Sequence, residues 1–140
     1  MTRFLVDNSV LARISRPQVY QVLSDLAAQG HELSSSMVSL AEAGYSAKTT
    51  DDYDNLVDRL RYGWLYLESG PMVDAIALDL RRSLHIAGSN RAVGAMDVLL
   101  AATALAHNAV VLHYDADFDQ ITAAHPGLRA RWAVPRGSID

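Results

Sequence analysis

Short apolar segments that alternate with longer helical patterns constrain the fold of this chain more than any other feature. Phe4-Leu5-Val6 and Val110-Val111-Leu112 are uninterrupted runs of β-branched or apolar residues, a pattern typical of buried strands. A weaker strand pattern covers residues 32–35, and a last one covers residues 130–134. Strands that alternate with helices predict an α/β fold, with a parallel sheet covered by helices on both faces.

The expected helices are delimited by proline, glycine and capping residues. Pro17 suits the first turn of a helix that Gly30 ends, and Ser36 suits the cap of the next helix. A long amphipathic helix is expected from Thr50 to Gly70, with aromatic and aliphatic residues along one side. The full set of expected helices covers residues 17–30, 37–47, 50–70, 71–88, 96–107 and 118–124.

Length and composition predict one domain that covers residues 1–140. A chain of this size buries roughly two-thirds of its unfolded surface, so the fold needs no covalent staple. Cysteine is absent, which excludes disulfides and thiolate zinc sites and indicates a reducing cytoplasm. The first residues carry no signal-peptide pattern and no segment approaches the length of a membrane span, so we expect a soluble cytoplasmic protein.

The charge balance is compatible with two interpretations. A net charge of −4 and a pI of about 5.6 ordinarily argue against a nucleic-acid partner. Eleven of the twelve basic residues are nonetheless arginine, with Lys48 the exception, and planar guanidinium groups can grip phosphate in two places. A GC-rich genome explains the same bias equally well, so composition alone identifies no site.

Four carboxylates occupy positions that a parallel sheet would bring together. Asp7 follows the first strand, Asp115 follows a late strand, Glu42 lies inside a helix and Asp97 opens another helix. Ligands of open α/β sheets bind beyond the carboxyl ends of the strands, so Asp7 and Asp115 would share a crevice. The sequence gaps are 35, 55 and 18 residues (42−7, 97−42, 115−97), so only the fold can gather the four. Oxygen ligands in this number suit Mg²⁺ or Mn²⁺.

A structural role competes with metal binding at several of these acids. Asp7 precedes a turn signal and Asp97 opens a helix, so either side chain could serve as a cap. Glu42 has small or apolar neighbours and no partner one helical turn away, so its charge needs a partner elsewhere in the fold. Asp117 is either a ligand or a helix cap, and Asp119 is expected to be a solvated helix residue.

The sequence lacks the residue patterns that other metal-binding and catalytic sites require. The acids from Asp115 to Asp119 alternate as in a calcium loop, but Gln120 and Pro126 stand where such a loop needs glycine and glutamate. No nucleophile elbow or Walker loop exists, and the five histidines are scattered, so each is expected to be a packing or surface residue. A phosphoaspartate enzyme would need a second acid beside Asp7 and a nearby lysine, and the sequence indicates neither.

Four segments together resemble the signature segments of PIN-domain nucleases, and most closely those of the VapC toxins of bacterial toxin–antitoxin pairs. In chain order they are Leu5–Leu11 (LVDNSVL), Ser39–Glu42 (SLAE), Ala95–Ala102 (AMDVLLAA) and His113–Asp119 (HYDADFD). The resemblance extends from Phe4 to about Val134, and its strength lies in order and spacing, since each segment alone is weak. Tyr114 departs from the pattern, because a small hydroxyl residue or arginine is more usual there, and this leaves the substrate preference open.

The resemblance implies a PIN α/β/α sandwich with a five-stranded parallel sheet and endoribonuclease activity that depends on Mg²⁺ or Mn²⁺. It also implies homodimerisation and neutralisation by a VapB-type antitoxin. By position, the family's acidic quartet corresponds to Asp7, Glu42, Asp97 and Asp115, with Asp117 as the adjacent variable acid. Asp7 and Asp97 are expected to be direct ligands, whereas Glu42 and Asp115 would complete the shell or orient the attacking water.

The mechanism expected from this resemblance is hydrolysis of RNA by water that a carboxylate-held metal activates. Ser9 would hold a water or a phosphate oxygen, and Arg91 would contact the RNA backbone, although ordinary loop roles fit both residues. Two rival functions stay open. One is a catalytically silent PIN-like module that binds RNA or protein, and the other is a metal-dependent phosphatase or DNA nuclease that uses the same ligands.

Overall fold

A five-stranded sheet, in which all neighbouring strands run parallel, forms the centre of the molecule. The computed structural model describes every residue from Met1 to Asp140. The strand order is β3-β2-β1-β4-β5, which places β1 in the middle. The strands are β1 (Arg3–Val6), β2 (Glu32–Ser36), β3 (Leu65–Leu67), β4 (Val110–His113) and β5 (Ala130–Trp132). Phe4 of β1 pairs with Leu33 of β2 and with Val110 of β4, so segments far apart in the sequence adjoin in the sheet.

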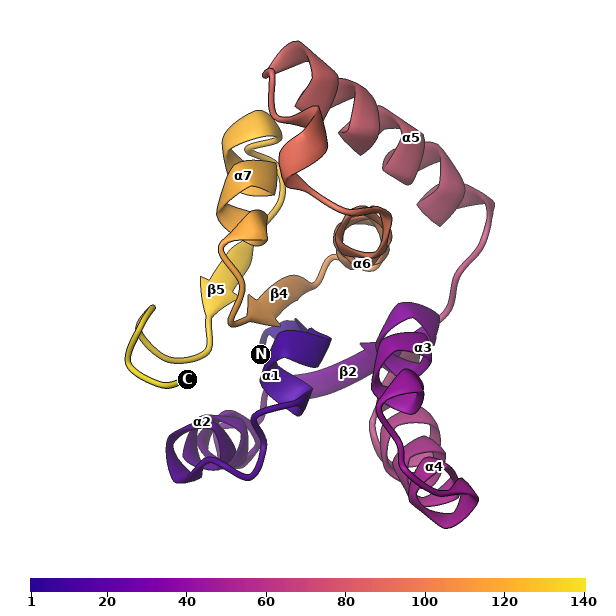
Figure 1. Ribbon diagram of the computed structural model, residues 1–140, viewed down its shortest axis with the longest axis vertical. Helices are drawn as coiled ribbons and strands as arrows, with labels where there is room; N and C mark the ends of the chain where they lie inside the picture. Colours follow the sequence, from indigo (N-terminus) through magenta and orange to yellow (C-terminus); the bar gives the residue numbers. More distant parts are fainter.

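Helices cover both faces of the sheet (Figure 1), as expected for buried parallel strands. One side carries α5 (Pro71–Ile86), α6 (Ala95–Ala106) and α7 (Asp117–Ala124), and the other carries α2 (Pro17–Ala28) and α4 (Thr50–Val57). Leu5 and Val111 point into the core under α5–α7, whereas Phe4, Val6 and Leu112 point into the core under α2. This alternation confirms the predicted α/β class with both faces covered.

Two further helices start directly where strands end. α1 (Asn8–Leu11) follows β1 after one residue, and α3 (Met37–Tyr45) follows β2 immediately. The Ser36 hydroxyl accepts the Ser39 N–H and caps α3, as predicted. Gly30 and Gly88 end α2 and α5 with φ angles of 85° and 75°, a left-handed conformation that glycine adopts without steric cost. No helix combines the length and apolar character needed to cross a bilayer.

The prediction of one helix from Thr50 to Gly70 is wrong for the second half of that range. α4 ends at Val57, a π-helical segment covers Asp58–Gly63, and β3 follows. β3 pairs in parallel with β2 and forms an edge of the sheet. Leu67 packs into the core under α5, whereas Tyr66 packs against the core under α2. Neighbouring residues therefore serve opposite faces, and hydrogen bonds to β2 favour a strand over the helix that the apolar spacing suggested.

Candidate metal centre

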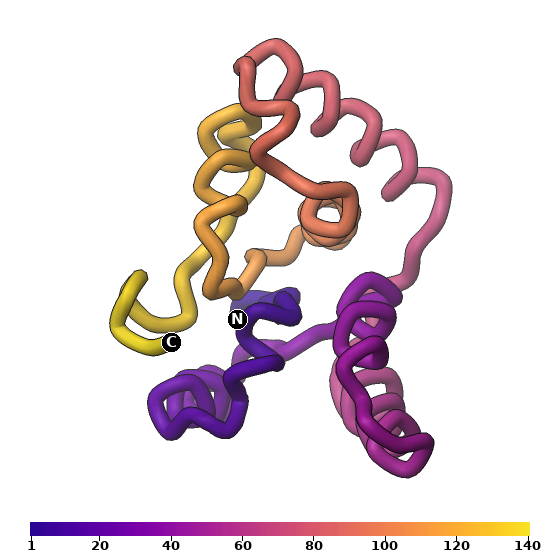
Figure 2. The backbone as a smooth tube through the Cα atoms, in the orientation of Figure 1, coloured from indigo at the N-terminus to yellow at the C-terminus, as the bar shows by residue number.

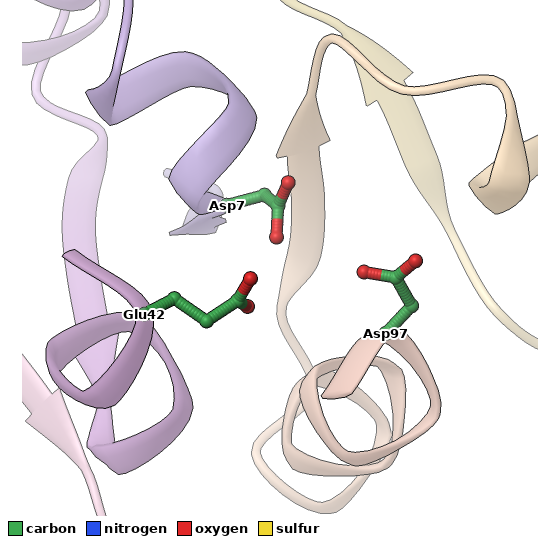
Figure 3. A group of neighbouring side chains, drawn as sticks. All are labelled: Asp7, Glu42 and Asp97. Carbon is green, nitrogen blue, oxygen red and sulfur yellow. The ribbon is translucent and has the colours of Figure 1, made fainter. Parts of the chain in front are cut away.

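The carboxyl ends of β1 and β4 bring two acids together in the middle of the sheet. Asp7 follows β1 directly, and its backbone N–H donates to the Leu112 carbonyl of β4 at 2.9 Å. Asp115 follows β4 after one intervening residue. Glu42 and Asp97 approach the same edge from α3 and α6, and Figure 3 shows Asp7, Glu42 and Asp97 pointing toward one another.

Five carboxylates form two overlapping groups at this edge. In the first group, oxygen atoms of Asp7, Glu42 and Asp97 all lie within 4.8 Å of one another. In the second group, the same holds for Asp97, Asp115 and Asp117. Asp97 belongs to both groups and joins them into one acidic cluster. The fold thus gathers the four acids of the predicted quartet together with the adjacent Asp117.

Asp7 combines a capping role with a place in the cluster. Its side chain accepts the Ser9 N–H at 3.0 Å and caps α1, so the structural role considered for it is real. Asp7 is only 3% exposed, and burial raises the pKa of its carboxyl, with the Asp115 charge adding to the rise. Hydrogen bonds from Ser9 and Asn8 lower the pKa of Asp7 and offset part of that rise. One carboxylate can cap a helix and still present its free lone pairs to a cation.

Glu42 contains a polar atom that the protein itself does not satisfy. Its Oε1 is buried and has no hydrogen-bond partner. Burial raises the pKa of Glu42, and the charges of Asp7 and Asp115 raise it further. A buried carboxylate oxygen without a donor is unfavourable unless a proton or a cation compensates its charge. The oxygen-only donor set and this unpartnered atom fit a hard divalent ion.

Asp97 is not a helix cap. Gly94 occupies the N-cap position of α6 and no side chain caps that helix, so the alternative role considered for Asp97 is absent. Burial raises the pKa of Asp97 to about 7, and the charges of Asp7, Asp115, Asp117 and Glu42 contribute to the rise in that order. A carboxyl with a pKa near 7 readily exchanges its proton for a metal ion at physiological pH.

The acids after β4 take different roles. Asp115 Oδ1 accepts the Asp117 N–H at 2.9 Å, so Asp115, and not Asp117, supports the start of α7. Burial and the Asp115 charge raise the pKa of Asp117, and a hydrogen bond with Asp97 lowers it in part. Asp119 is exposed and accepts the Trp132 indole N–H at 3.2 Å, in agreement with a solvated helix position.

The two residues considered for substrate binding lie in different settings. The Ser9 hydroxyl accepts the Tyr114 N–H at 2.8 Å, which ties α1 to the chain just after β4. Ser9 therefore has a structural bond in addition to its contacts with Asp7. Arg91 is exposed in a 3-10 turn (Asn90–Ala92) that leads to α6, close in sequence to Asp97.

Two residues that support the cluster were missed by the sequence analysis. His113 is fully buried, and its Nδ1 accepts the Asp115 N–H at 3.2 Å, while burial lowers the pKa of the ring. Ser39 donates from its hydroxyl to the Val6 carbonyl at 3.3 Å and fixes α3 against the end of β1. The available signal was their spacing, because each polar residue stands two or three positions before a cluster acid in otherwise apolar sequence.

The sequence matches the model of a known family over most of its length. The model described as PIN domain matches residues 4–124. This chain belongs to the PIN domain family. The match includes all five acids of the cluster, so the PIN domain of this chain and its acidic cluster coincide.

Relatives of this PIN domain align with it from end to end. Ribonuclease VapC51 of Mycobacterium tuberculosis is 37% identical, with 99% of this chain and 98% of that protein covered. Ribonuclease VapC18 of the same organism is 34% identical, with coverages of 97% and 98%. Identity at this level over whole chains places this PIN domain among the VapC ribonucleases.

Solved structures share the fold at lower sequence identity. The structure titled VapBC2 from Rickettsia felis bound to a promoter DNA fragment gives a TM-score of 0.75 at 20% identity, with 93% of this chain and 98% of that chain covered. DNA-bound VapBC from Salmonella typhimurium gives a TM-score of 0.76 at 19% identity, with coverages of 96% and 100%. The PIN fold predicted from the resemblance is confirmed.

Proposed function

We infer that this PIN domain is a metal-dependent endoribonuclease toxin of the VapC type. The observation that carries the inference is the convergence of five carboxylates, of which Asp7 is buried and the others partly buried, and in which Glu42 Oε1 has no protein partner. A domain that only binds RNA has no need for such a cluster, because converging acids repel the phosphates it would bind. The full-length relatives named as VapC ribonucleases support the same activity.

We propose Mg²⁺ or Mn²⁺ as the ion, held by Asp7 and Asp97 directly and by Glu42 and Asp115 directly or through water. When bound, the ion supplies positive charge at the scissile phosphate and makes water a better nucleophile. Ser9 and Asn8 orient Asp7 through their N–H groups, and His113 orients the chain at Asp115. The carboxylates are therefore positioned before substrate arrives, which reduces the cost of organising the site.

The acids of the cluster can also take part in proton transfer from the attacking water. A carboxylate with a raised pKa, such as that of Glu42, can accept a proton from an attacking water. Attack by water on phosphorus that expels the 3′-oxygen leaves a 5′-phosphate and a 3′-hydroxyl, and the ribose 2′-hydroxyl takes no part. A single 2′-deoxy substitution at the scissile nucleotide is therefore expected to permit cutting.

The proposed biological context is a toxin–antitoxin pair in the cytoplasm, in which residues 1–140 act as a single domain. The solved neighbours include VapBC complexes, and we propose a VapB-type antitoxin as the partner of this chain. A cationic side chain of the antitoxin placed over the acidic cluster would replace the charge that the metal supplies. Competition between antitoxin and Mn²⁺ for the purified protein tests this form of inhibition.

The decisive assay compares three substrates side by side. Structured RNA, single-stranded DNA and a small phosphate ester are each incubated with the protein in Mg²⁺, in Mn²⁺ and in EDTA. We expect cleavage of RNA with metal and none in EDTA, and Asp97→Asn serves as the inactive control. Cleavage of the ester or of DNA in preference to RNA would replace ribonuclease with phosphatase or DNA nuclease. Binding of RNA without cleavage in either metal would favour the silent module.

A further inference from the structure

The segment Pro135–Asp140, called the strap here, folds back over Tyr114 and the turn between α1 and α2. In Figure 2 this last part of the tube curls toward α2. Asp140 contacts Arg13 and Arg16, which lie in the turn just before α2. The Tyr114 hydroxyl donates to the Ile139 carbonyl at 2.6 Å and accepts the N–H groups of Gly137 at 3.0 Å and Ile139 at 3.2 Å. Tyr114 thus uses its whole hydrogen-bonding capacity to hold the strap.

Two arginines grip Asp140 at the end of the strap. Arg13 Nε donates to the backbone oxygen of Asp140 at 2.6 Å, and Arg16 pairs with the Asp140 carboxylate at 3.3 Å. The Arg13 guanidinium also lies over the Tyr114 ring, 4.9 Å from its centroid. Asp140 therefore places its carboxylate on the Arg16 guanidinium and a backbone oxygen on that of Arg13, and guanidinium groups are the side chains best suited to phosphate.

This arginine pair is connected to the acidic cluster by short links. Arg13 donates to the Ser9 carbonyl at 2.8 Å, and the Ser9 N–H is bonded to Asp7. Tyr114, under the Arg13 guanidinium, directly precedes Asp115. An RNA backbone that reaches the cluster meets a strongly negative surface, so fixed positive charge next to it would favour binding. Arg13 supplies that charge next to the cluster, and Arg16 continues it toward the strap.

We propose that Arg13 and Arg16 form a binding site for an RNA phosphate next to the scissile one, and that Asp140 occupies this site until RNA displaces it. The inference rests on the proposed ribonuclease function. The Arg16–Asp140 pair is easily displaced, because the two side chains are 44% and 96% exposed and exposed ion pairs contribute little stability. Tyr114 keeps the strap nearby, so only Asp140 has to move when a phosphate takes its place.

The first test measures binding of a single-stranded RNA by fluorescence anisotropy in EDTA, where no cleavage occurs. Asp140→Asn removes the competing charge and is expected to tighten binding by about two- to five-fold, the range of a single exposed ion pair. Asp25→Asn is the matched control, since it makes the same change in net charge at an exposed position of α2 whose only side-chain partner is Gln21. Equal tightening by both variants would mean that overall charge alone is responsible and would overturn the proposal.

The second test is a double-mutant cycle with Arg16→Gln. This substitution should weaken RNA binding and should abolish the gain from Asp140→Asn, because the two changes act on one site. Loss of one phosphate contact should also reduce the slope of log affinity against log salt by about 0.7. Arg129→Gln is the control, because Arg129 is exposed and bonds to Asn108 at the opposite end of β4. Thermal melts of all variants establish that they are folded.

The outcomes separate this inference from the proposed function. If the protein cuts RNA with Mg²⁺ but the cycle is additive, the phosphate site is wrong and the nuclease assignment stands. If the cycle shows coupling but no metal supports cleavage, the site stands and the nuclease assignment falls. Absence of any RNA binding in EDTA by wild type and by Asp140→Asn would overturn the phosphate site alone, because the cleavage assay with metal decides the nuclease assignment.

Discussion

Asp97 experiences the strongest electrostatic conflict in the cluster. It is the one residue shared by both groups of acids, and its pKa is raised to about 7 by burial and by four neighbouring carboxylates. The fold holds this side chain where its charge is unfavourable without a cation. On the proposed function, metal binding would remove that repulsion, so affinity for the ion and a lower stability of the metal-free protein would have the same origin.

Replacing Asp97 by Asn should separate activity from stability. We expect RNA cleavage to fall by at least about 100-fold, which exceeds the usual loss from a residue that only supports a metal ligand. Metal-free thermal stability should be unchanged or higher, and Mg²⁺ should stabilise wild type more than the variant, because the ion binds only the folded site. Cleavage assays and melting curves with and without millimolar Mg²⁺ measure these effects. An active variant would contradict the assignment of Asp97 as a ligand.

Asp97 contributes to the pH dependence of the stability of the metal-free protein, and the sign of its contribution is defined. The folded pKa of Asp97 lies near 7, above its ordinary value of 3.8, so the folded state holds more protons between these two values. Stability therefore falls as pH rises from about 4 to about 7 and levels off above that. His113 acts in the opposite direction, because burial lowers its pKa. The pKa values of Asp7, Glu42 and Asp117 are also raised, so these acids act in the same direction as Asp97. The difference between wild type and Asp97→Asn reports the Asp97 contribution together with its coupling to these neighbours.

Urea unfolding in EDTA at several values between pH 5 and pH 8 measures this effect. The midpoint of wild type should decline relative to that of Asp97→Asn as the pH increases. A constant difference between the two proteins across this range would show that Asp97 keeps an ordinary pKa in the folded protein.

At the scale of elements, the sequence predicted four of the five strands, most clearly those whose residues are apolar on both faces. β1 and β4 belong to this class, and the acids that follow them could be placed at one edge of the sheet from topology alone. β3 could not be predicted, because three residues give too short a pattern and Leu60, Trp64 and Leu67 happen to fit helical spacing. Only pairing with β2, a long-range interaction, decides between the two conformations.

Long-range interactions also limited what the sequence could predict about the site. Residue type and order sufficed to select Asp7, Glu42, Asp97 and Asp115, which the fold gathers with Asp117. The unpartnered Oε1 atom and the raised pKa values depend on burial and on neighbours from other elements, which no local pattern encodes. The strap contacts of Tyr114 also join residues that are 25 positions apart in the sequence. Tyr114 accordingly stood out only as a departure from a family pattern.

The strand assignment of β3 gives a stability prediction. Leu67 is 2% exposed in the core under α5, whereas Leu65, on the same strand, is 41% exposed. Leu67→Ala should lower the free energy of unfolding by about 2–5 kcal/mol, the usual range for a large-to-small substitution in a core. Leu65→Ala should lower it by less than about 1 kcal/mol, since surface substitutions have small effects. Urea titration of both variants measures these changes, provided that the two m-values are equal. Equal losses of unfolding free energy in the two variants would argue against this placement of β3.

At the scale of the whole molecule, several large apolar side chains between Thr50 and Gly88 are exposed on the surface. Of the aromatic residues in this region, Trp64 and Tyr66 pack inward, whereas Tyr53 and Tyr62 are 46% and 73% exposed. α5 adds Met72, Leu78 and Ile86, which are 65%, 76% and 71% exposed. Exposed apolar groups in this number are typical of a protein interface.

We therefore predict a homodimer formed through this region. Light scattering at micromolar concentration without antitoxin should give about twice the chain mass of 15.3 kDa. Leu78→Asp should shift the mass toward the monomer, because it places a charge in the apolar interface. Tyr20→Asp is the matched control, since Tyr20 is 63% exposed on α2, outside the region. A monomeric wild type, or dissociation by the control alone, would exclude this interface.

The pairing of β1 with β4 has a consequence for the time at which the protein becomes active. Phe4 is in register with Val110, 106 residues later (110−4), so the middle of the sheet cannot close while the ribosome is still adding the intervening chain. At roughly 5–20 residues per second, this interval lasts about 5–20 s. Asp7 and Asp115 come together only when it ends. A nascent copy therefore lacks the acidic cluster throughout most of its own synthesis. On the proposed function, an antitoxin that is already folded would have that interval in which to be present when the cluster first forms.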